Sequence, residues 1–147
     1  MIKIICVGKI KEKFYKEAIE EYTKRLSKYT KINIIEVNDE IVNELEKERD
    51  SILKYINTKD YIITLEIDGI NLSSIDFSKK IEETLNINSN ITFIIGGSIG
   101  LHQDIKDLAN YKLSFSKMTF PHQLFRVILL EQIYRAFKIM NNESYHK

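Results

Sequence analysis

The residues with the most potential for chemistry in this 147-residue sequence lie in one stretch, residues 91–126. An apolar strand pattern runs there directly into a Gly-rich turn, Gly96 to Gly100 (GGSIG). Glycines at a strand end let the backbone approach a ligand closely or take positive φ, so an adenosine-like group could lie against bare peptide. The turn matches neither GxGxxG nor a phosphate-binding P-loop, and a plain tight turn explains it equally well.

A loop in the same stretch is the second candidate for a ligand site. It runs from Lys117 to His122, between an expected strand and an apolar helix, and it contains no glycine, so something other than backbone flexibility must constrain it. Pro121 fits the first turn of the helix, and Thr119 is a possible cap before it. Arg126 lies beside the loop, where it could face a ligand or substrate; a buried ion pair with a partner subunit is the alternative.

Two kinds of segment alternate along the chain and must position these residues. Near-continuous apolar runs, typical of strands covered on both faces, predict strands at residues 1–7, 32–37, 61–67, 91–95 and 112–116. Apolar residues at helical spacing predict helices at residues 11–29, 39–55, 73–85 and 124–140, and a short helix is expected to start at residues 102–104. This alternation predicts an α/β fold with a mainly parallel sheet flanked by helices, which would bind a ligand at the carboxyl ends of its strands.

Local signals refine this outline. Asp68-Gly69 is expected to form a turn after the third strand. Ser73 and Asp76 resemble a capping box, and His102 is expected to have a local capping role. The first helix should bury one apolar stripe, made of Phe14, Ala18, Tyr22, Leu26 and Tyr29.

Composition limits the class of protein. A length of 147 residues with 44% hydrophobic content suits a single domain covering residues 1–147, without linker or repeat. No apolar run approaches the ~18 residues that cross a bilayer, so neither membrane insertion nor secretion is indicated. The one cysteine, Cys6, is expected to be a small buried residue and fits a reducing, cytoplasmic setting.

Charge is segregated along the chain although the net charge is only +1. Both ends are basic and the middle is acidic, so a fold that brings the termini together could present a basic face to a phosphate backbone. The candidates for that face are Lys9, Lys11, Lys13, Lys16, Arg126, Arg135 and Lys138. An ordinary solvated surface is the alternative.

The last predicted helix, residues 124–140, is apolar on more than one side. A small protein has too little core of its own to cover such a helix. The pattern therefore predicts a subunit interface and a homodimer.

The motifs in these segments resemble a known family. They are IICVGKIKEKFYKEAIEEYTKRL, ITLEIDG, FIIGGSIGLHQD, LSFSKMTFPHQLFRVILLEQIYRAFKIM and the terminal YHK. Together they are similar to the ribosomal RNA large subunit methyltransferase H family, in the SPOUT class of knotted methyltransferases. The resemblance covers almost the whole chain, and its specific motifs are SFSKMTFPHQ and the terminal YH, whereas GGSxG alone is not specific.

The resemblance implies a fold and an activity that composition and spacing do not. The fold would be an α/β knot with a C-terminal trefoil, in a homodimer that binds S-adenosylmethionine in the knot. The activity would be methylation of N3 of a pseudouridine in 23S rRNA of the large subunit, with the assembled 70S ribosome as substrate. No metal ion would be needed, because the sulfonium supplies an activated methyl.

The resemblance also implies roles for individual residues. The cofactor site would comprise Leu65, Gly96, Phe115, Ser116, Lys117, Met118, Thr119 and Phe120. Tyr145 and His146 would help to remove the N3 proton, with Arg135 and Arg126 holding phosphate or the base. The further residues expected to face the substrate are Lys9 and His122.

Two other functions stay open at this point. One is a SPOUT relative that methylates another RNA or ribose position, and a 2′-O enzyme of this kind would not need the YH tail. The other is a non-catalytic ribosome-binding protein that has lost its affinity for the cofactor.

Overall fold

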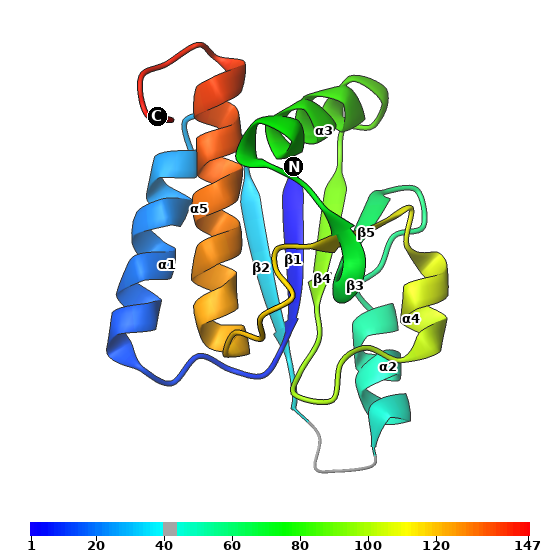
Figure 1. The fold of residues 1–147 in the computed structure, drawn as a ribbon. Helices are drawn as coiled ribbons and strands as arrows, with labels where there is room; N and C mark the ends of the chain where they lie inside the picture. The colour runs from blue at the N-terminus through cyan, green and yellow to red at the C-terminus, as the bar shows by residue number, and fades with distance from the viewer. Residues whose placement is uncertain (40–43) are drawn as a thin grey trace.

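The computed structural model describes residues 1–39 and 44–147, which contain one sheet of five parallel strands (Figure 1). The strands are β1 (Ile2–Val7), β2 (Ile32–Val37), β3 (Tyr61–Asn71), β4 (Ile91–Ile95) and β5 (Tyr111–Ser114), in the spatial order β2-β1-β4-β3-β5. The helices are α1 (Lys13–Leu26), α2 (Leu45–Leu53), α3 (Ser74–Ile87), α4 (Gln103–Leu108) and α5 (His122–Met140). The predicted parallel sheet flanked by helices is confirmed, and the trefoil knot stays a prediction.

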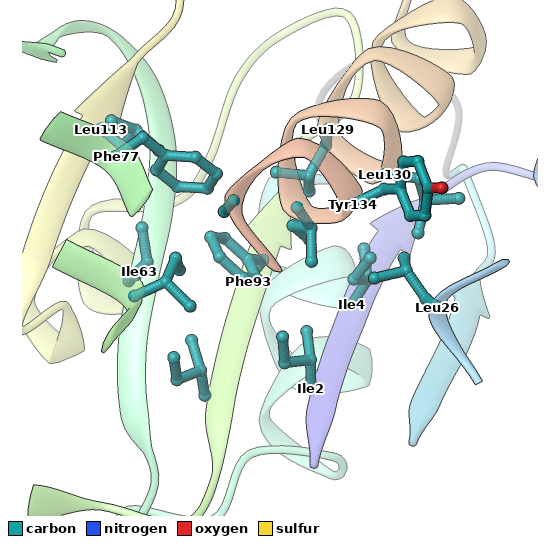
Figure 2. Close-up of a cluster of buried hydrophobic side chains, with 14 of the residues drawn as sticks. Ile2, Ile4, Leu26, Ile63, Phe77, Phe93, Leu113, Leu129, Leu130 and Tyr134 are labelled. Atoms are coloured by element: carbon teal, nitrogen blue, oxygen red, sulfur yellow. The ribbon is translucent and has the colours of Figure 1, made fainter. Parts of the chain in front are cut away.

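Helices cover both faces of the sheet because its strands are apolar on both faces. On one face, α1, α3 and α5 pack over the strands, with Leu129 of α5 above Phe93 and Ile4 (Figure 2). On the other face, α2 and α4 cover a second cluster that includes Ile5 and Ile94. The central strand β4 is buried along its whole length, as a strand between two layers of helices must be.

Two helix starts agree with the local sequence signals. At the start of α3, the hydroxyl of Ser73 accepts a hydrogen bond of 3.0 Å from the backbone N–H of Asp76. At the start of α4, Nδ1 of His102 accepts a bond of 3.0 Å from the N–H of Asp104. Both capping predictions are therefore confirmed.

The start of α5 differs from the prediction. The helix begins at His122, and Pro121 occupies the N-cap position with φ −55° and ψ 132°, without a side-chain cap. The predicted Thr119 cap is wrong, because Thr119 lies two residues before the N-cap and cannot act as the capping residue.

The first two helices are shorter than predicted. Leu26 at the end of α1 is buried, and Tyr29 beyond the helix stacks on Phe137 of α5, but Phe14 is 62% exposed and contacts the neighbouring ring of Tyr15 instead. The prediction of a buried Phe14 is therefore wrong for this chain by itself. The start predicted for the second helix includes residues 40–43, which lie outside the described residues, and α2 begins at Leu45.

Strand β3 continues through the predicted turn. Leu113 of β5 pairs with both Leu65 and Ile70 of β3, so residues 66–69 bulge out of the ladder and pairing resumes beyond them. The turn predicted at Asp68-Gly69 is therefore wrong, since both residues belong to this bulge. A Cβ atom on Gly69 would lie 2.8 Å from the backbone of Lys112, so the glycine permits a close approach of β5.

Replacing Gly69 with Ala is expected to destabilise the β3–β5 pair by about 1–3 kcal/mol, because β5 backbone must move away from the new methyl group. Urea unfolding followed by circular dichroism measures the change. The matched control is Asp68→Ala in the same bulge, where the side chain is exposed. Equal unfolding midpoints for Gly69→Ala and the control would contradict the close approach.

Candidate functional site

A pocket of about 680 Å³ lies at the carboxyl ends of β3, β4 and β5, the strand ends at which the sequence predicts a ligand site. Apolar side chains, bare backbone and a few charged groups line it together. Among the residues predicted to bind a cofactor, those that line the pocket are Leu65, Gly96, Phe115, Ser116, Met118, Thr119 and Phe120. Lys117 is the one member of that set that does not.

The Gly-rich turn forms one wall of this pocket. A Cβ atom on Gly96 would lie 2.8 Å from the carbonyl carbon and oxygen of Gly100, so no side chain fits where the turn closes. Gly97 and Gly100 form an isolated bridge, and Gly100 has a φ of +81°, a conformation that glycine adopts without strain. The turn therefore presents backbone rather than side chains to the pocket.

Aromatic contacts hold the glycine-free loop that forms the opposite wall. The ring of Phe115 lies 6.1 Å from that of Phe77 and 5.0 Å from that of Phe125, and Phe120 also contacts Phe125. The hydroxyl of Ser116 accepts a hydrogen bond of 3.0 Å from a backbone N–H within the loop. These contacts hold the loop in one conformation. They are the constraint that is expected for a loop without glycine.

Met118 is expected in the cofactor site, but most of its side chain lies at the surface. It touches the pocket, but the side chain is 75% exposed. An exposed methionine at the mouth of a pocket is available to a ligand or to a second molecule.

Charged groups at the pocket were not predicted from the sequence as binding residues. Glu66 and Asp68 reach the pocket because the β3 bulge carries them there, and Lys106 reaches it from α4. The Glu66 carboxylate accepts a hydrogen bond of 2.6 Å from the hydroxyl of Thr64 and lies 3.8 Å from Nζ of Lys106. The sequence signal was the strand end at residues 65–68, which was expected to lie near a ligand, but Glu66 was counted only as part of the strand and Asp68 only as part of a turn.

Arg126 lies inside the protein, not on a ligand-facing surface. Its side chain is 1% exposed and donates to the Glu36 carboxylate at 2.6 Å. It also donates to the carbonyl oxygens of Val7 at 3.0 Å and Gly8 at 2.6 Å. The expected substrate contact is not available in this arrangement, because these partners within the same chain occupy the guanidinium.

His122 and Lys9 lie near this buried arginine but differ in position. His122 lines the pocket, and a Cβ atom placed on Gly8 would lie 3.8 Å from its Nε2. Lys9 is exposed and does not line the pocket. The structure thus brings His122 together with the predicted cofactor residues and leaves Lys9 at the surface.

The predicted catalytic residues form a separate cluster, the C-terminal cluster, made of Glu131, Arg135, Tyr145 and His146. Arg135 donates to the Glu131 carboxylate at 2.8 Å, and the Tyr145 hydroxyl donates to the same oxygen at 3.0 Å. Nη1 of Arg135 lies 3.2 Å from Nδ1 of His146. Burial and the bond to Glu131 raise the pKa of Tyr145 to about 12, so its hydroxyl stays protonated at neutral pH.

Glu131 is a residue of this cluster that sequence reasoning missed. Only the folding back of the tail onto the last helix brings Tyr145 to this carboxylate. No spacing signal in the sequence connects residues 131 and 145, which lie on different elements.

The tail that carries Tyr145 and His146 is anchored through Glu143. Its carboxylate accepts hydrogen bonds from the Tyr29 hydroxyl at 2.7 Å and from Lys138 at 3.0 Å. These bonds, that of Tyr29 foremost, lower the pKa of Glu143 to about 2, so the anchor keeps its charge across the physiological range. The cluster therefore has a defined place against α5 and the segment that follows α1.

The C-terminal cluster and the pocket lie apart in one chain. His122, at the start of α5, lines the pocket, whereas Arg135 lies thirteen residues along the same helix. At 1.5 Å per residue that separation is about 20 Å. One chain alone does not bring the predicted catalytic residues to the predicted cofactor residues.

Neither a metal site nor a membrane-spanning helix is found in the part of the chain that the structure describes. In the described ranges 1–39 and 44–147, no group of three or more His, Cys, Asp or Glu side chains is arranged to hold a metal ion. No helix in that part of the chain combines the length and the apolar character needed to cross a membrane.

Cys6 is buried, and burial raises the pKa of its thiol to about 12, as expected for an unreactive core residue.

Solved structures share this fold. A probable methylase family protein from Haemophilus influenzae superposes with a TM-score of 0.57 at 14% identity, covering 99% of this chain and 70% of its own. The tRNA (m1G37) methyltransferase from Aquifex aeolicus gives a TM-score of 0.54 at 11% identity, covering 91% of this chain and 69% of its own. At such low identity the likeness shows that this chain shares the α/β fold of these proteins.

Sequence comparison identifies the family within that class. The family model described as "Predicted SPOUT methyltransferase" matches residues 1–146, and the chain belongs to this family. Ribosomal RNA large subunit methyltransferase H of Clostridium botulinum is 57% identical over 157 aligned positions, with 99% of both chains covered. A putative protein of the same name from Methanococcus maripaludis is 54% identical at the same coverage, so the resemblance of the motifs is confirmed.

Replacing Arg126 with Met is expected to cost about 3–5 kcal/mol of unfolding free energy, because it removes the partner of Glu36 and the donors to two buried carbonyls. Denaturant unfolding measures the loss. The control is Arg25→Met, which removes an exposed ion pair with Glu21 and should leave the unfolding midpoint unchanged. If Arg126→Met unfolds at the wild-type midpoint, the buried network does not stabilise the fold.

Proposed function

We propose that this chain is an S-adenosylmethionine-dependent methyltransferase acting on 23S rRNA of the large ribosomal subunit. The modified atom is N3 of a pseudouridine, and the substrate is the assembled ribosome in the cytoplasm. One observation carries the proposal: a single pocket at the strand ends gathers every predicted cofactor residue except Lys117. RNA is proposed as the substrate because relatives that are up to 57% identical over nearly the full chain are named as ribosomal RNA methyltransferases.

The pocket suits S-adenosylmethionine in size and chemistry. Its apolar side chains, such as Leu65 and Phe115, can cover an adenine ring, and the turn at Gly96 offers backbone groups to the ring edge. Glu66 and Asp68 place carboxylates where a ligand carrying sulfonium and ammonium charges would be stabilised. The bound cofactor would supply the activated methyl group, so the protein's own task is to hold the base and help its N3 lose a proton.

The candidate groups for that task are Arg135, Tyr145 and His146, which lie about 20 Å along α5 from the pocket in the same chain. A homodimer with α5 at its interface resolves this separation, because a two-fold contact places the same surfaces of two chains against each other. The C-terminal cluster of one chain would then complete the pocket of its partner. The exposed Met118 and Phe14 provide apolar surface for the contact.

Contacts with rRNA would come from the basic surface beside the pocket. His122 lies at the pocket, and Lys9 follows β1 at the surface next to it. Lysines that neutralise phosphates give affinity without sequence information, so base selection would depend on the pocket and on the ribosomal context.

Methyl transfer from labelled cofactor tests the proposed function directly. Assembled ribosomes should be labelled, and free large subunits and naked rRNA should be labelled less, because a chain of this size offers little surface for reading rRNA alone. Mapping the label to N3 of a pseudouridine would support the assignment. Labelling of transfer RNA with none on ribosomes would contradict it, as would the absence of any transfer.

Replacing Gly96 with Ala is expected to weaken binding of S-adenosylmethionine by at least tenfold, about 1.4 kcal/mol, because the methyl group meets the backbone of Gly100 and distorts the pocket wall. Isothermal titration calorimetry measures the affinity, and a melting curve checks that the variant folds. The control is Ser98→Ala in the same turn, which adds no atoms. Wild-type affinity in Gly96→Ala would remove the turn from the cofactor site.

A further inference from the structure

The C-terminal cluster determines which nitrogen of the His146 ring carries a proton. Nδ1 of His146 lies 3.2 Å from Nη1 of Arg135, within hydrogen-bond distance. A guanidinium has only donors and keeps its charge, so it cannot accept a hydrogen bond. Nδ1 must therefore be the acceptor, and the neutral ring then carries its hydrogen on Nε2.

Arg135 is itself fixed in place. Its Nη2 and Nε donate to the two oxygens of Glu131 at 2.8 and 3.4 Å. Its guanidinium carbon lies 4.7 Å from the centre of the Tyr145 ring, and the Tyr145 hydroxyl bonds to Glu131 at 3.0 Å. The bond to Glu131 raises the pKa of Arg135, which keeps it a donor at every accessible pH. The guanidinium can leave His146 only by breaking several of these contacts.

The other nitrogen of His146 is open to a ligand. The residue is exposed, and within residues 1–39 and 44–147 its Nε2 makes no hydrogen bond. The cluster thus leaves Nε2–H of His146 open as a hydrogen-bond donor, while Nδ1 of the same ring is held by the Arg135 guanidinium. A general base would need an unprotonated nitrogen at that position.

We propose that His146 acts on the substrate base as a hydrogen-bond donor through Nε2–H rather than as a general base, and that Glu131 and Arg135 are positioning residues that hold this tautomer. This inference rests on the proposed function, since it assigns a role in methylating N3 of a pseudouridine. Each of these residues contacts another member of the C-terminal cluster, and none of the contacts depends on the pocket of the same chain.

The chemistry of the base explains why a donor is useful. N3 lies between two ring carbonyls, so the negative charge left when its proton passes to water is shared by their oxygens. An N–H aimed at one of these oxygens stabilises that charge. The bond between N3 and the methyl carbon then forms as the carbon–sulfur bond of the methyl donor breaks, which leaves a neutral thioether and a neutral methylated base.

Nitrogen-15 spectra of the three histidine rings in the full-length protein test the tautomer without any substrate. His102 is an internal reference, because its Nδ1 accepts from the backbone N–H of Asp104 and its ring must also carry hydrogen on Nε2. His146 is expected to match His102, with its signals assigned from the His146→Gln variant. In Arg135→Met the ring should exchange between both tautomers, and its two nitrogen shifts should move toward their average.

Turnover of three variants tests the role. Gln places an amide N–H at the position of Nε2, so His146→Gln is expected to keep kcat within about tenfold of wild type, whereas His146→Ala should lose on the order of 100-fold. The matched control is His146→Asn, whose amide lies at the position of Nδ1 and which should be as slow as Ala. All three should bind the cofactor with wild-type affinity.

The outcomes distinguish a failure of the donor role of His146 from a failure of the proposed methyltransferase function. An Nδ1–H tautomer in the wild-type protein, or equal turnover of His146→Gln and His146→Ala, overturns the donor role and supports a base. If the wild-type protein transfers no methyl to ribosomes, the proposed function fails, while the spectra still establish which nitrogen carries the proton.

Discussion

The buried guanidinium of Arg126 is the contact on which the geometry of the pocket depends. It joins three elements, because Glu36 belongs to β2, Val7 ends β1, and Arg126 itself lies in the first turns of α5. A charge that is 1% exposed is tolerated only when it is paired, so the helix cannot shift along the sheet without losing the bonds to Glu36, Val7 and Gly8. Since α5 begins at His122, this contact also fixes where the loop before it ends.

The pocket then follows from two further constraints on backbone position. Residues 66–69 bulge from β3 because Gly69 lets β5 approach closely, and this bulge brings Glu66 and Asp68 to the strand ends. The loop after β5 must return from the edge of the sheet to β1, where α5 begins (Figure 1). Aromatic contacts of Phe115 and Phe120 hold it along that path. A preformed pocket of this kind loses little entropy when a ligand binds.

The sequence predicts what depends on local pattern and misses what depends on the fold. The span of β4, the cap at Ser73 and the parallel sheet follow from apolar periodicity and capping chemistry, which act over a few residues. The Gly69 bulge could not be predicted, since its cause is the backbone of β5 more than forty residues later. The prediction that Arg126 lies near a ligand is wrong because its partners on β1 and β2 are distant in the sequence. They lie about 90 or more residues away. Glu131 was missed because the tail must fold back to reach it.

The predicted site residues thus fall into two groups that a single chain keeps apart, the pocket and the C-terminal cluster. We propose that two chains of a homodimer join them. Co-expression of Gly96→Ala with His146→Ala tests it, because each mixed dimer would hold one pocket and one tail that are both intact. Methyl transfer to ribosomes is expected to recover to about a quarter of the wild-type level, since half of the dimers are mixed and each mixed dimer has one working site of two. Activity no greater than the sum of the two separate variants would contradict it.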